Sequence, residues 1–443
     1  MYKILGIVFI CLTSFSLFSQ SENSPLSRFG IGDLVNENFI HARSMGSLGA
    51  TNKGIYHINI VNPASLASLR TTAFDIGLSA KYSTLTDRND RSISQWGGNL
   101  EYLSLAFPLS NPLNDILDRE ERDYNLGMAF TLMPHSIVAY DISSLDSLSG
   151  IGEFRRNFTG NGGSYKFYWS NAISYKNISF GLNLGYLFGN IEYSRNIAFD
   201  QVAFPYQTQF IEDYSLKGFL WNAGLQYDLI LNKKDLSGKK NVPVKKITFG
   251  LRGNSNTGFS TSSDIVERVV QFSLAGTVLD ADTLNFDLDK RGSGTLPASF
   301  GVGATYQTGQ KFAFGVNYSS TAWNNYFNEN NPENLNNTYK ISAGGFIRPS
   351  YRSYSNFLKR ASYRFGGFYN TDPRKIDGTD LKSYGVTFGL GLPFIYQRKV
   401  SHANLGFEMG SRGSGTPLSE TYARFLLSFT FNDDEWFIKR KYD

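Results

Sequence analysis

The residues of this 443-residue chain that are best suited to chemistry are its four histidines, and they are scattered along the sequence. His41, His57, His135 and His402 show none of the short spacings that bind a metal ion in known motifs. Ser136 follows His135 and makes the one local Ser-His candidate, but no nucleophile-elbow motif or strand-helix pattern accompanies it. We therefore expect no catalytic residue, no metal site and no cofactor, and we predict that the protein is not an enzyme.

The first twenty residues predict export from the cytoplasm. Residues 1–20 combine a basic start at Lys3, an apolar stretch over residues 4–18 and the small residue Ser19, which is the pattern of a Sec signal peptide. Cys11 is the only cysteine and lies inside this segment, so the mature chain has no disulfide and no thiol for catalysis. An exported chain without disulfides suits the outer membrane of a Gram-negative cell.

The basic residues gather in places that we expect to be turns. The formal net charge is +5, and lysine and arginine cluster within residues 232–246, 348–360 and 398–399. Such clusters could contact nucleic acid, but no aromatic-basic binding module accompanies them. Solvated turns at the membrane edge explain the clusters more simply, so we expect no nucleic-acid partner.

Segments in which large apolar residues alternate with small or polar residues make up most of the mature chain. Within residues 164–189, for example, Phe167 and Trp169 share one face, while Lys166 and Ser170 share the other. Side chains on a strand point to opposite faces with period two, and an apolar outside with a polar inside is typical of an outer-membrane barrel. The mean hydropathy of −0.27 and the aromatic content of 15% also favour such strands over membrane helices.

Fourteen segments of this kind follow one another, and most have the roughly nine to eleven residues that a tilted strand needs to cross a bilayer. They are Thr72–Tyr82, Gly98–Pro108, Tyr124–Pro134, Ser164–Lys176, Ile178–Tyr193, Tyr214–Leu231, Lys246–Ser260, Leu296–Gln307, Lys311–Ala322, Thr338–Arg348, Arg360–Asn370, Leu381–Pro393, Val400–Arg412 and Glu420–Phe431. An even number is expected for a closed bacterial barrel. We predict an all-β chain that forms a 14-stranded antiparallel transmembrane β-barrel over residues 71–432.

The connections between these segments alternate in length. Three long polar connections, at residues 138–163, 194–213 and 261–295, are expected to be loops at the cell surface, because short turns of such barrels face the periplasm. Two connections on the periplasmic side, residues 109–123 and 349–359, are longer than usual and could each hold a short helix.

Two flanking segments complete the predicted organisation. Residues 21–70 are rich in Gly, Asn and Ser and alternate weakly, so we expect them to fold back and plug the lumen. Residues 433–443 are predicted to form a periplasmic tail, in which Trp436 and Lys439 could anchor at the membrane interface.

Several short motifs carry a resemblance to a known family. A Gly-Ala pair within Ala42–Ala50 is followed by Asn62-Pro63-Ala64, and fourteen strands follow both. This arrangement resembles the FadL-type family of outer-membrane transport proteins, which take up long-chain fatty acids and other hydrophobic compounds. The pieces Asn23–Asp33, Leu296–Tyr306, Tyr384–Phe394 and Glu435–Asp443 are similar to variants from Bacteroidetes, a group that includes barrels associated with type IX secretion.

The resemblance implies a hatch in the lumen and a lateral exit near a kinked strand. Carried onto this chain, Asn62, Pro63 and Ala64 would belong to the hatch, although they could also form a simple tight turn before the first strand. Pro134 would mark the strand kink and lateral opening, since proline cannot donate to a strand ladder. The alternative for Pro134 is that it ends the third strand at a loop.

Strand parity points many charged side chains into the lumen. Lys or Arg on the lipid face near mid-bilayer would cost about 2–4 kcal/mol, which favours inward placement. The residues with inward parity are Lys166, Asp228, Arg252, Arg364, Glu408, Arg412 and Arg424. They could form ion pairs that brace the wall and the hatch. Alternatively Arg364, Arg412 or Arg424 could bind the carboxylate of a fatty acid, which the fork of arginine suits.

Two functions from different classes follow from this interpretation. The first is passive uptake of hydrophobic, fatty-acid-like molecules through a hatch-gated lumen. The alternative is a non-transporting barrel subunit of an outer-membrane protein secretion or assembly complex, of the type IX secretion kind. The expected partners are outer-membrane lipid and either a hydrophobic ligand or the proteins of such a complex. An apolar pocket in the lumen would favour transport, whereas a lumen filled with salt bridges would favour the subunit.

Overall fold

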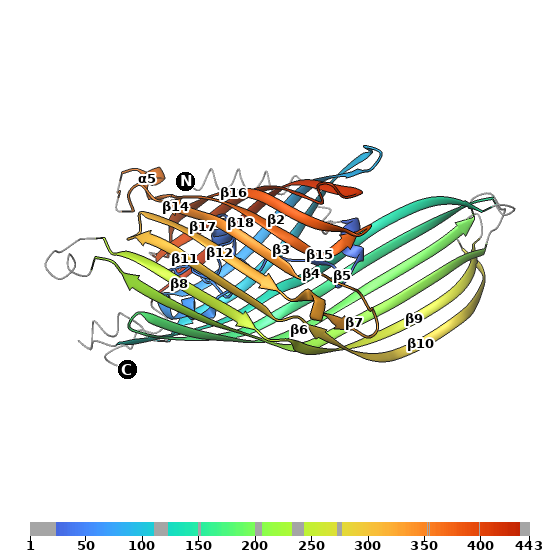
Figure 1. The fold of residues 1–443 in the computed structure, drawn as a ribbon, viewed down its shortest axis with the longest axis horizontal. Coiled ribbons are helices and arrows are strands. Elements are labelled where there is room, and N and C mark those ends of the chain that lie inside the picture. Colours follow the sequence, from blue (N-terminus) through green and yellow to red (C-terminus); the bar gives the residue numbers. More distant parts are fainter. Residues whose placement is uncertain are drawn as a thin grey trace.

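The structure, a computed structural model, is one antiparallel sheet that closes on itself as a barrel (Figure 1). It describes residues 24–109, 123–148, 152–199, 206–232, 243–272, 277–351, 353, 355–397 and 399–434. The last spanning strand pairs with the first spanning strand, from Leu418↔Asp87 to Asp433↔Thr72, and this pairing closes the barrel. Among the described residues, no helix combines the length and apolar character needed to span a membrane.

Fourteen spanning strands form the wall, so the predicted fold is confirmed. The strands are β2 (Thr72–Asp87), β3 (Ser92–Pro108), β4 (Tyr124–Leu148), β5 (Gly152–Tyr175), β6 (Ile178–Phe199), β7 (Tyr206–Ile230), β8 (Lys245–Asn254) with its continuation β9 (Thr257–Phe272), β10 (Val278–Leu296) with its continuation β11 (Ser299–Thr308), β12 (Phe312–Thr321), β14 (Thr338–Ile347), β15 (Ser362–Ile376), β16 (Thr379–Tyr396), β17 (Lys399–Arg412) and β18 (Leu418–Asp433). Each of the fourteen segments predicted from alternation overlaps one of them, with ends that differ by a few residues or more.

The remaining elements are short. They are the two-residue strands β1 (Asp33–Leu34) and β13 (Phe327–Asn328), the 3-10 helices η1 (Pro25–Arg28), η2 (Pro63–Ser68) and η3 (Trp323–Asn325), and the one-turn helices α2 (Ile40–Arg43) and α5 (Phe357–Arg360). Helix α5 lies in the predicted connection 349–359 and extends one residue beyond it. The predicted signal peptide, most of the connection 109–123 and most of the predicted tail lie outside the described residues.

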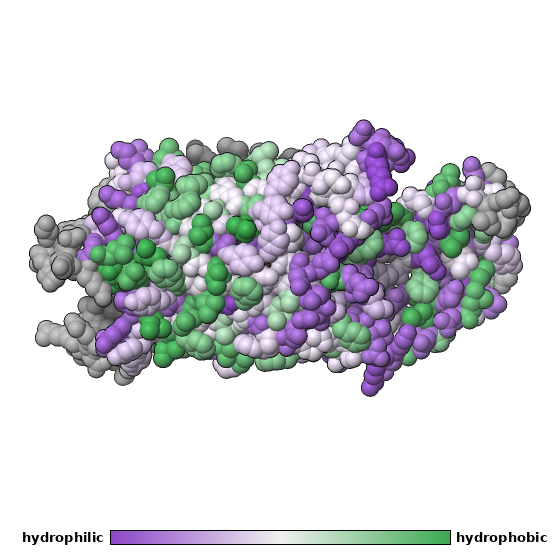
Figure 2. All heavy atoms as spheres, in the orientation of Figure 1, coloured by the Kyte–Doolittle hydropathy of each residue, from purple (hydrophilic) through white to green (hydrophobic). Residues whose placement is uncertain are grey.

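The period-two pattern separates the two faces of the wall as expected. Phe167 and Trp169 of β5 are each 43% exposed, whereas Lys166, which precedes them, and Ser170, which follows them, are buried. Apolar side chains gather over one half of the outer surface and hydrophilic side chains over its middle (Figure 2). The apolar half includes the end of the barrel that carries the short turns, which is the periplasmic end in barrels of this kind.

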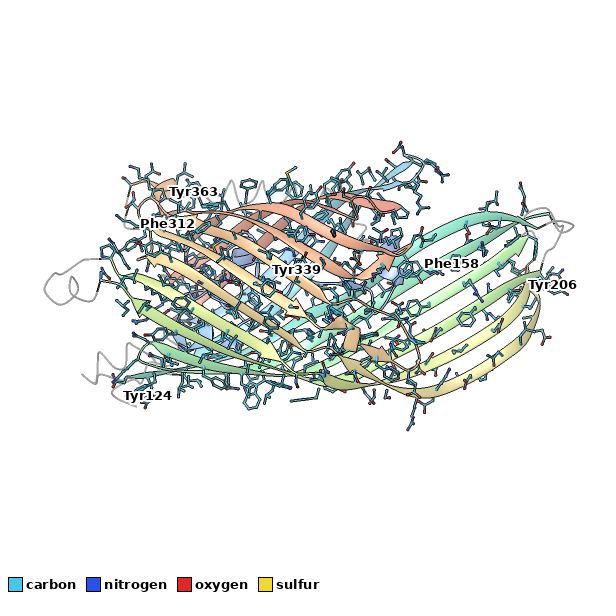
Figure 3. The ribbon with its side chains drawn as sticks, viewed as in Figure 1. Tyr124, Phe158, Tyr206, Phe312, Tyr339 and Tyr363 are labelled. Carbon is cyan, nitrogen blue, oxygen red and sulfur yellow. The ribbon has the colours of Figure 1, made fainter. Side chains whose placement is uncertain are left out.

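The three connections predicted as long loops are instead strand in their described parts. Strands β4 to β7, β9 and β10 run on beyond the other strands as a curved sheet, which we call the wall extension (Figure 1). Phe158 and Tyr206 lie in it, far from Tyr124 at the short-turn end (Figure 3). The ladder between β4 and β5 is continuous in this direction as far as Leu148↔Gly152. The prediction was wrong here because the length and polar character of these connections were interpreted as loop, whereas strands can continue beyond the bilayer with polar residues while their backbone still pairs.

A matched pair of substitutions tests which part of the wall contacts lipid. Leu225 of β7 and Leu284 of β10 are 42% and 59% exposed. We expect Leu225→Arg to lower the free energy of unfolding by about 2–4 kcal/mol, because arginine would face lipid. Leu284→Arg, on the wall extension, should change it by less than about 0.5 kcal/mol. Urea unfolding in lipid vesicles measures both, and equal effects would contradict this assignment.

Candidate functional site in the barrel interior

The chain that precedes the first spanning strand lies inside the barrel. We call residues 24–71 the inner segment. Its helix η2 packs on strands β3 to β7, and α2 packs on β16 to β18. On the far side, Thr51 Oγ1 lies 2.6 Å from Thr305 Oγ1 of β11. Contact with strands from all around the circle is possible only from within, and Figure 1 shows this blue segment inside the ring of strands.

Asn62, Pro63 and Ala64 lie together on the inner face of β6, β7 and β8. The Asn62 side-chain oxygen accepts from the Ala64 amide at 3.2 Å and so caps η2. Its amide group donates to the carbonyl of Ala50 at 2.7 Å and to wall carbonyls, those of Leu225 and Leu251. The wall makes room with glycine, since a Cβ on Gly181 would stand 2.3 Å from the Ala64 nitrogen. The motif is therefore a capped turn whose backbone lies directly on the wall.

A first group of buried charges holds Arg43 of α2. Its guanidinium donates to Glu408 at 2.8 Å and to Glu101 at 3.2 Å, and all three side chains are at most 5% exposed. Tyr422 donates to the same Glu408 at 3.1 Å. Burial would lower the pKa of Arg43, but the two carboxylates raise it above its ordinary value, so this arginine remains charged.

A second group of charges holds Asp33 of β1. Arg412 of β17 and Arg374 of β15 each donate to Asp33 at 2.7 Å, and Arg374 also pairs with Asp372 at 2.6 Å. Glu37 of the inner segment accepts from Lys166 at 2.6 Å in the same way. The predicted ion pairs between the wall and the segment in the lumen are therefore present, and they lie on several sides of the barrel.

The inner segment also covers a place where two wall strands separate. The ladder between β3 and β4 begins at Pro108↔Gly127 and ends at Leu103↔Leu132. Beyond this point β1 pairs with β4 at Leu34↔Ser136 and Asp33↔Ile137, so it takes the place of β3. The amide of Ser24 continues this pairing by donating to the Ala139 carbonyl at 2.8 Å.

Pro134 lies at this divergence but does not end β4. The ladder between β4 and β5 skips His135 between Pro134↔Tyr165 and Ser136↔Ser164, which makes a β-bulge. Proline, which has no N–H to donate, is tolerated within sheets beside such bulges, where the regular ladder is interrupted. A groove of about 1100 Å³ begins here at Pro134 and crosses the outer face of β5, β6 and β7. Of the two sequence interpretations, the strand stop is thus wrong, and the lateral opening remains a prediction.

The three arginines predicted to bind a carboxylate do not form one site. Arg412 already binds the carboxylate of Asp33 in this chain. Arg424 lines a polar cavity of about 390 Å³ together with Arg412 and Glu408, and its guanidinium lies 5.8 Å from the centre of the Tyr422 ring. Arg364 is separate, in another cavity near the short turns, where it donates to Asn404 at 2.8 Å.

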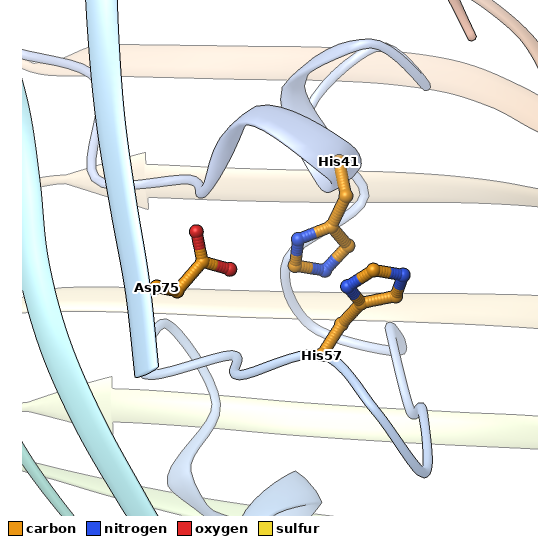
Figure 4. A group of neighbouring side chains, drawn as sticks. All are labelled: His41, His57 and Asp75. Carbon is orange, nitrogen blue, oxygen red and sulfur yellow. The ribbon is translucent and has the colours of Figure 1, made fainter. Parts of the chain in front are cut away.

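Three of the scattered histidines meet in this second cavity. The ring centres of His41 and His57 are 4.6 Å apart, and those of His57 and His402 are 4.8 Å apart. Figure 4 shows His41 and His57 beside Asp75 of β2, and one ligand atom from each of these three residues lies within 4.8 Å of the others. Their spacing in the sequence does not group them; only the folding of the inner segment onto the wall does.

This cluster has donor atoms that a metal ion could use, but its surroundings oppose a cation. Burial lowers the pKa of His41 and His57 well below the usual range, and neighbouring Arg364 acts in the same direction, so both rings are neutral. Neutral imidazole is the form that binds zinc. The positive charge of Arg364 beside the cluster would, however, repel a divalent ion, and Asp75 is the only carboxylate in the group.

The local Ser-His candidate is not arranged as a catalytic pair. The Ser136 hydroxyl lies 2.6 Å from the Ser164 hydroxyl, and these two form a hydrogen bond across the ladder. The Nε2 atom of His135 has no partner among the described residues. Without a hydrogen bond between base and hydroxyl, this pair has no activated nucleophile.

Removal of Arg43 tests how strongly the charges hold the inner segment. We expect Arg43→Met to lower the free energy of unfolding by about 3–5 kcal/mol, because two carboxylates would remain buried without a partner. Lys375→Met, which breaks the exposed pair with Asp380 in the wall, should leave stability unchanged within error. Urea unfolding of both variants in vesicles gives the comparison. A loss no greater than that of the control would show that these charges do not hold the segment.

Comparison with known proteins supports the fold. A family model described as BamG matches residues 1–443. The crystal structure of a Pseudomonas aeruginosa FadL homologue superposes with a TM-score of 0.53 at 11% identity, covering 90% of this chain and 99% of that chain. No curated protein matches the sequence.

Two toluene transporters are also similar. TodX of Pseudomonas putida has a TM-score of 0.48 and 15% identity over 89% of this chain and 99% of its own. TbuX of Ralstonia pickettii has a TM-score of 0.48 and 11% identity over 90% and 99%. The likeness to the FadL homologue, at 11% identity, concerns the fold and not the cargo. The fold is that of an outer-membrane barrel of the FadL type, as the sequence motifs implied.

Proposed function

Because the chain belongs to the BamG family, we propose that it is a non-transporting barrel subunit of a complex that assembles or secretes outer-membrane proteins. The family name supports this class of function, and the proposal includes no catalytic activity. The observation that carries it is the set of buried ion pairs in the lumen, which join the inner segment to the wall on several sides.

The lumen contents are held in place rather than poised to move. Asp33, Glu37 and Arg43 of the inner segment each form ion pairs with the wall. Between these contacts, apolar side chains such as Ile40, Ile58 and Leu66 are fully buried. The cavity of about 390 Å³ next to them is lined by charged groups, which would not receive a hydrophobic molecule.

The wall extension offers a surface for a protein partner. Residues 281–290 of β10 are exposed throughout, including Leu284, Phe286 and Leu288 at 53–63%. One edge of β10 pairs with β9, whereas within the described chain its other edge is paired only at Gly294 and Thr295. A long strand with an open edge and exposed apolar side chains invites pairing with another chain. We assign this strand as the contact with a neighbouring subunit.

Native mass spectrometry of the tagged protein, extracted gently from its own outer membrane, tests the proposal. We expect a stoichiometric protein partner, and we expect its loss from the double variant Leu284→Lys, Phe286→Lys, because two charges would enter the interface. Ile93→Lys, at the 70% exposed tip of the β2–β3 hairpin, is the matched control and should retain the partner. A lone chain that carries a lipid-sized ligand would contradict the subunit role.

Uptake of hydrophobic molecules is a second candidate, and the divergence of β3 from β4 favours it. There the groove at Pro134 is lined by Leu100, Tyr165, Tyr186 and Phe188, which would suit an apolar molecule leaving sideways. Such an exit would require the inner segment to act as a hatch and β1 to leave the edge of β4. Fatty-acid-like cargo and gating are part of this proposal.

A disulfide between β1 and β4 separates the two candidates. The pair Leu34→Cys, Ser136→Cys joins residues that face each other in the ladder, and the mature chain that we predict has no other cysteine. If the barrel transports, oxidation should stop uptake of a fluorescent fatty acid by vesicles and reduction should restore it. The pair Thr84→Cys, Ser94→Cys in the β2–β3 hairpin is the control. Equal uptake by the two oxidised double-cysteine variants would reject a lateral exit between β1 and β4, and so would an absence of uptake by the wild type.

A further inference from the structure

A cavity of about 350 Å³ lies between the inner segment and the wall near the short turns. The inner segment lines it with His41 and His57, and the wall lines it with Arg364, His402 and Arg348, which directly follows β14. Neither the subunit role nor the transport role uses this cavity, so the inference below does not depend on them.

The lining of this cavity is strongly basic. Its charged side chains are Lys53, Arg70, Lys176, Lys246, Arg348, Arg364 and a single acidic residue, Asp228. Asp228 lies 3.1 Å from both Lys53 and Lys246, so its charge is already shared by these two lysines. The remaining positive charge has no counterpart in the lining.

Arg348 and Arg364 are the centre of this excess. Arg364 is only 5% exposed, and its guanidinium donates to the neutral side-chain oxygen of Asn404. Arg348 donates to Ser362 at 2.8 Å and to Gln310 at 3.2 Å, which are also neutral. Within the described part of the chain, no carboxylate lies within ion-pair distance of either guanidinium. Asp75 of β2 lies close enough to Arg364 to interact with it electrostatically, but the two form no ion pair. A buried cation without a directly paired carboxylate is costly, and a bound anion would lower that cost.

The neighbouring His402 can add a hydrogen-bond donor for an anion. His402 is 5% exposed, and its Nδ1 atom has no partner among the described residues. In the tautomer that carries the proton on Nδ1, this ring can donate to an anion. The lining therefore combines two guanidinium groups with an unused ring nitrogen.

We propose that this cavity binds the phosphate group of a phosphorylated ligand. A phosphate monoester carries a charge of about −1.5 to −2 at pH 7 and three acceptor oxygens, so it could balance both arginines at once. A carboxylate carries a single charge and would leave one guanidinium unbalanced. Arginine also binds phosphate through paired hydrogen bonds that fit its planar fork. The source could be a soluble phosphate ester or the headgroup of a phosphorylated lipid.

Isothermal titration of the full-length protein in uncharged detergent with inorganic phosphate tests the proposal. We expect saturable binding to one site, weakened about tenfold or more by Arg364→Gln and by Arg348→Gln, since each removes a charged donor. Arg291→Gln is the matched control, because Arg291 is an exposed arginine of β10 paired with Asp289, and it should bind like the wild type. Circular dichroism checks that each variant is folded, and the two variants report on the site independently.

Further titrations identify the source and can overturn the assignment. If the protein binds glycerol phosphate but does not enrich phosphatidic acid from mixed vesicles, the ligand is a soluble phosphate ester. If it enriches phosphatidic acid but does not bind glycerol phosphate, the ligand is a lipid headgroup. Either result supports a phosphate site. Acetate binding as tight as phosphate binding would overturn it, as would an absence of saturable phosphate binding or equal affinity in the wild type and both arginine variants.

Discussion

A strand in hydrocarbon cannot leave its backbone groups unpaired, and the rest of this structure depends on that constraint. Pairing of β18 with β2 closes the wall and removes both edges within the membrane. Within the described part of the wall, β3 and β4 separate, and there β1 supplies a partner for β4. The inner segment therefore occupies part of the lumen, and where β1 pairs with β4 it also belongs to the sheet.

Closure of the barrel wall also determines where charged side chains can lie. A wall that faces lipid on one side must turn its polar side chains inward, where they face each other in a narrow space. The inner segment carries charges of both signs, Asp33 and Glu37 opposite wall cations and Arg43 opposite wall carboxylates. The cavity at Arg348 and Arg364 differs because its one lining carboxylate, Asp228, is already paired with two lysines and forms no ion pair with either arginine.

Much of the wall could be predicted from the sequence, because alternation reports directly on a strand that has lipid on one face. Trp169 and Lys166 point to opposite faces as their order requires. The wall extension was not predicted, because residues such as 281–290 carry many polar side chains and lie in a long connection, which was interpreted as a surface loop. The site was predicted only in part. Parity gives the inward direction of Arg364, but not that Arg348 and His402 lie beside it, which depends on how distant strands align.

The position of the inner segment has a consequence for the order in which the chain folds. Arg43 contacts Glu408, and Asp33 contacts Arg412, across 365 and 379 residues of sequence. The part of the chain that is synthesised first thus completes its set of partners only after nearly all strands exist. Contacts so distant in sequence are slow to form, because a long loop must close before any of them contributes. Docking of the inner segment and the last pairing of the wall are thus expected to be a single late event, which leaves the nascent barrel open for most of its folding.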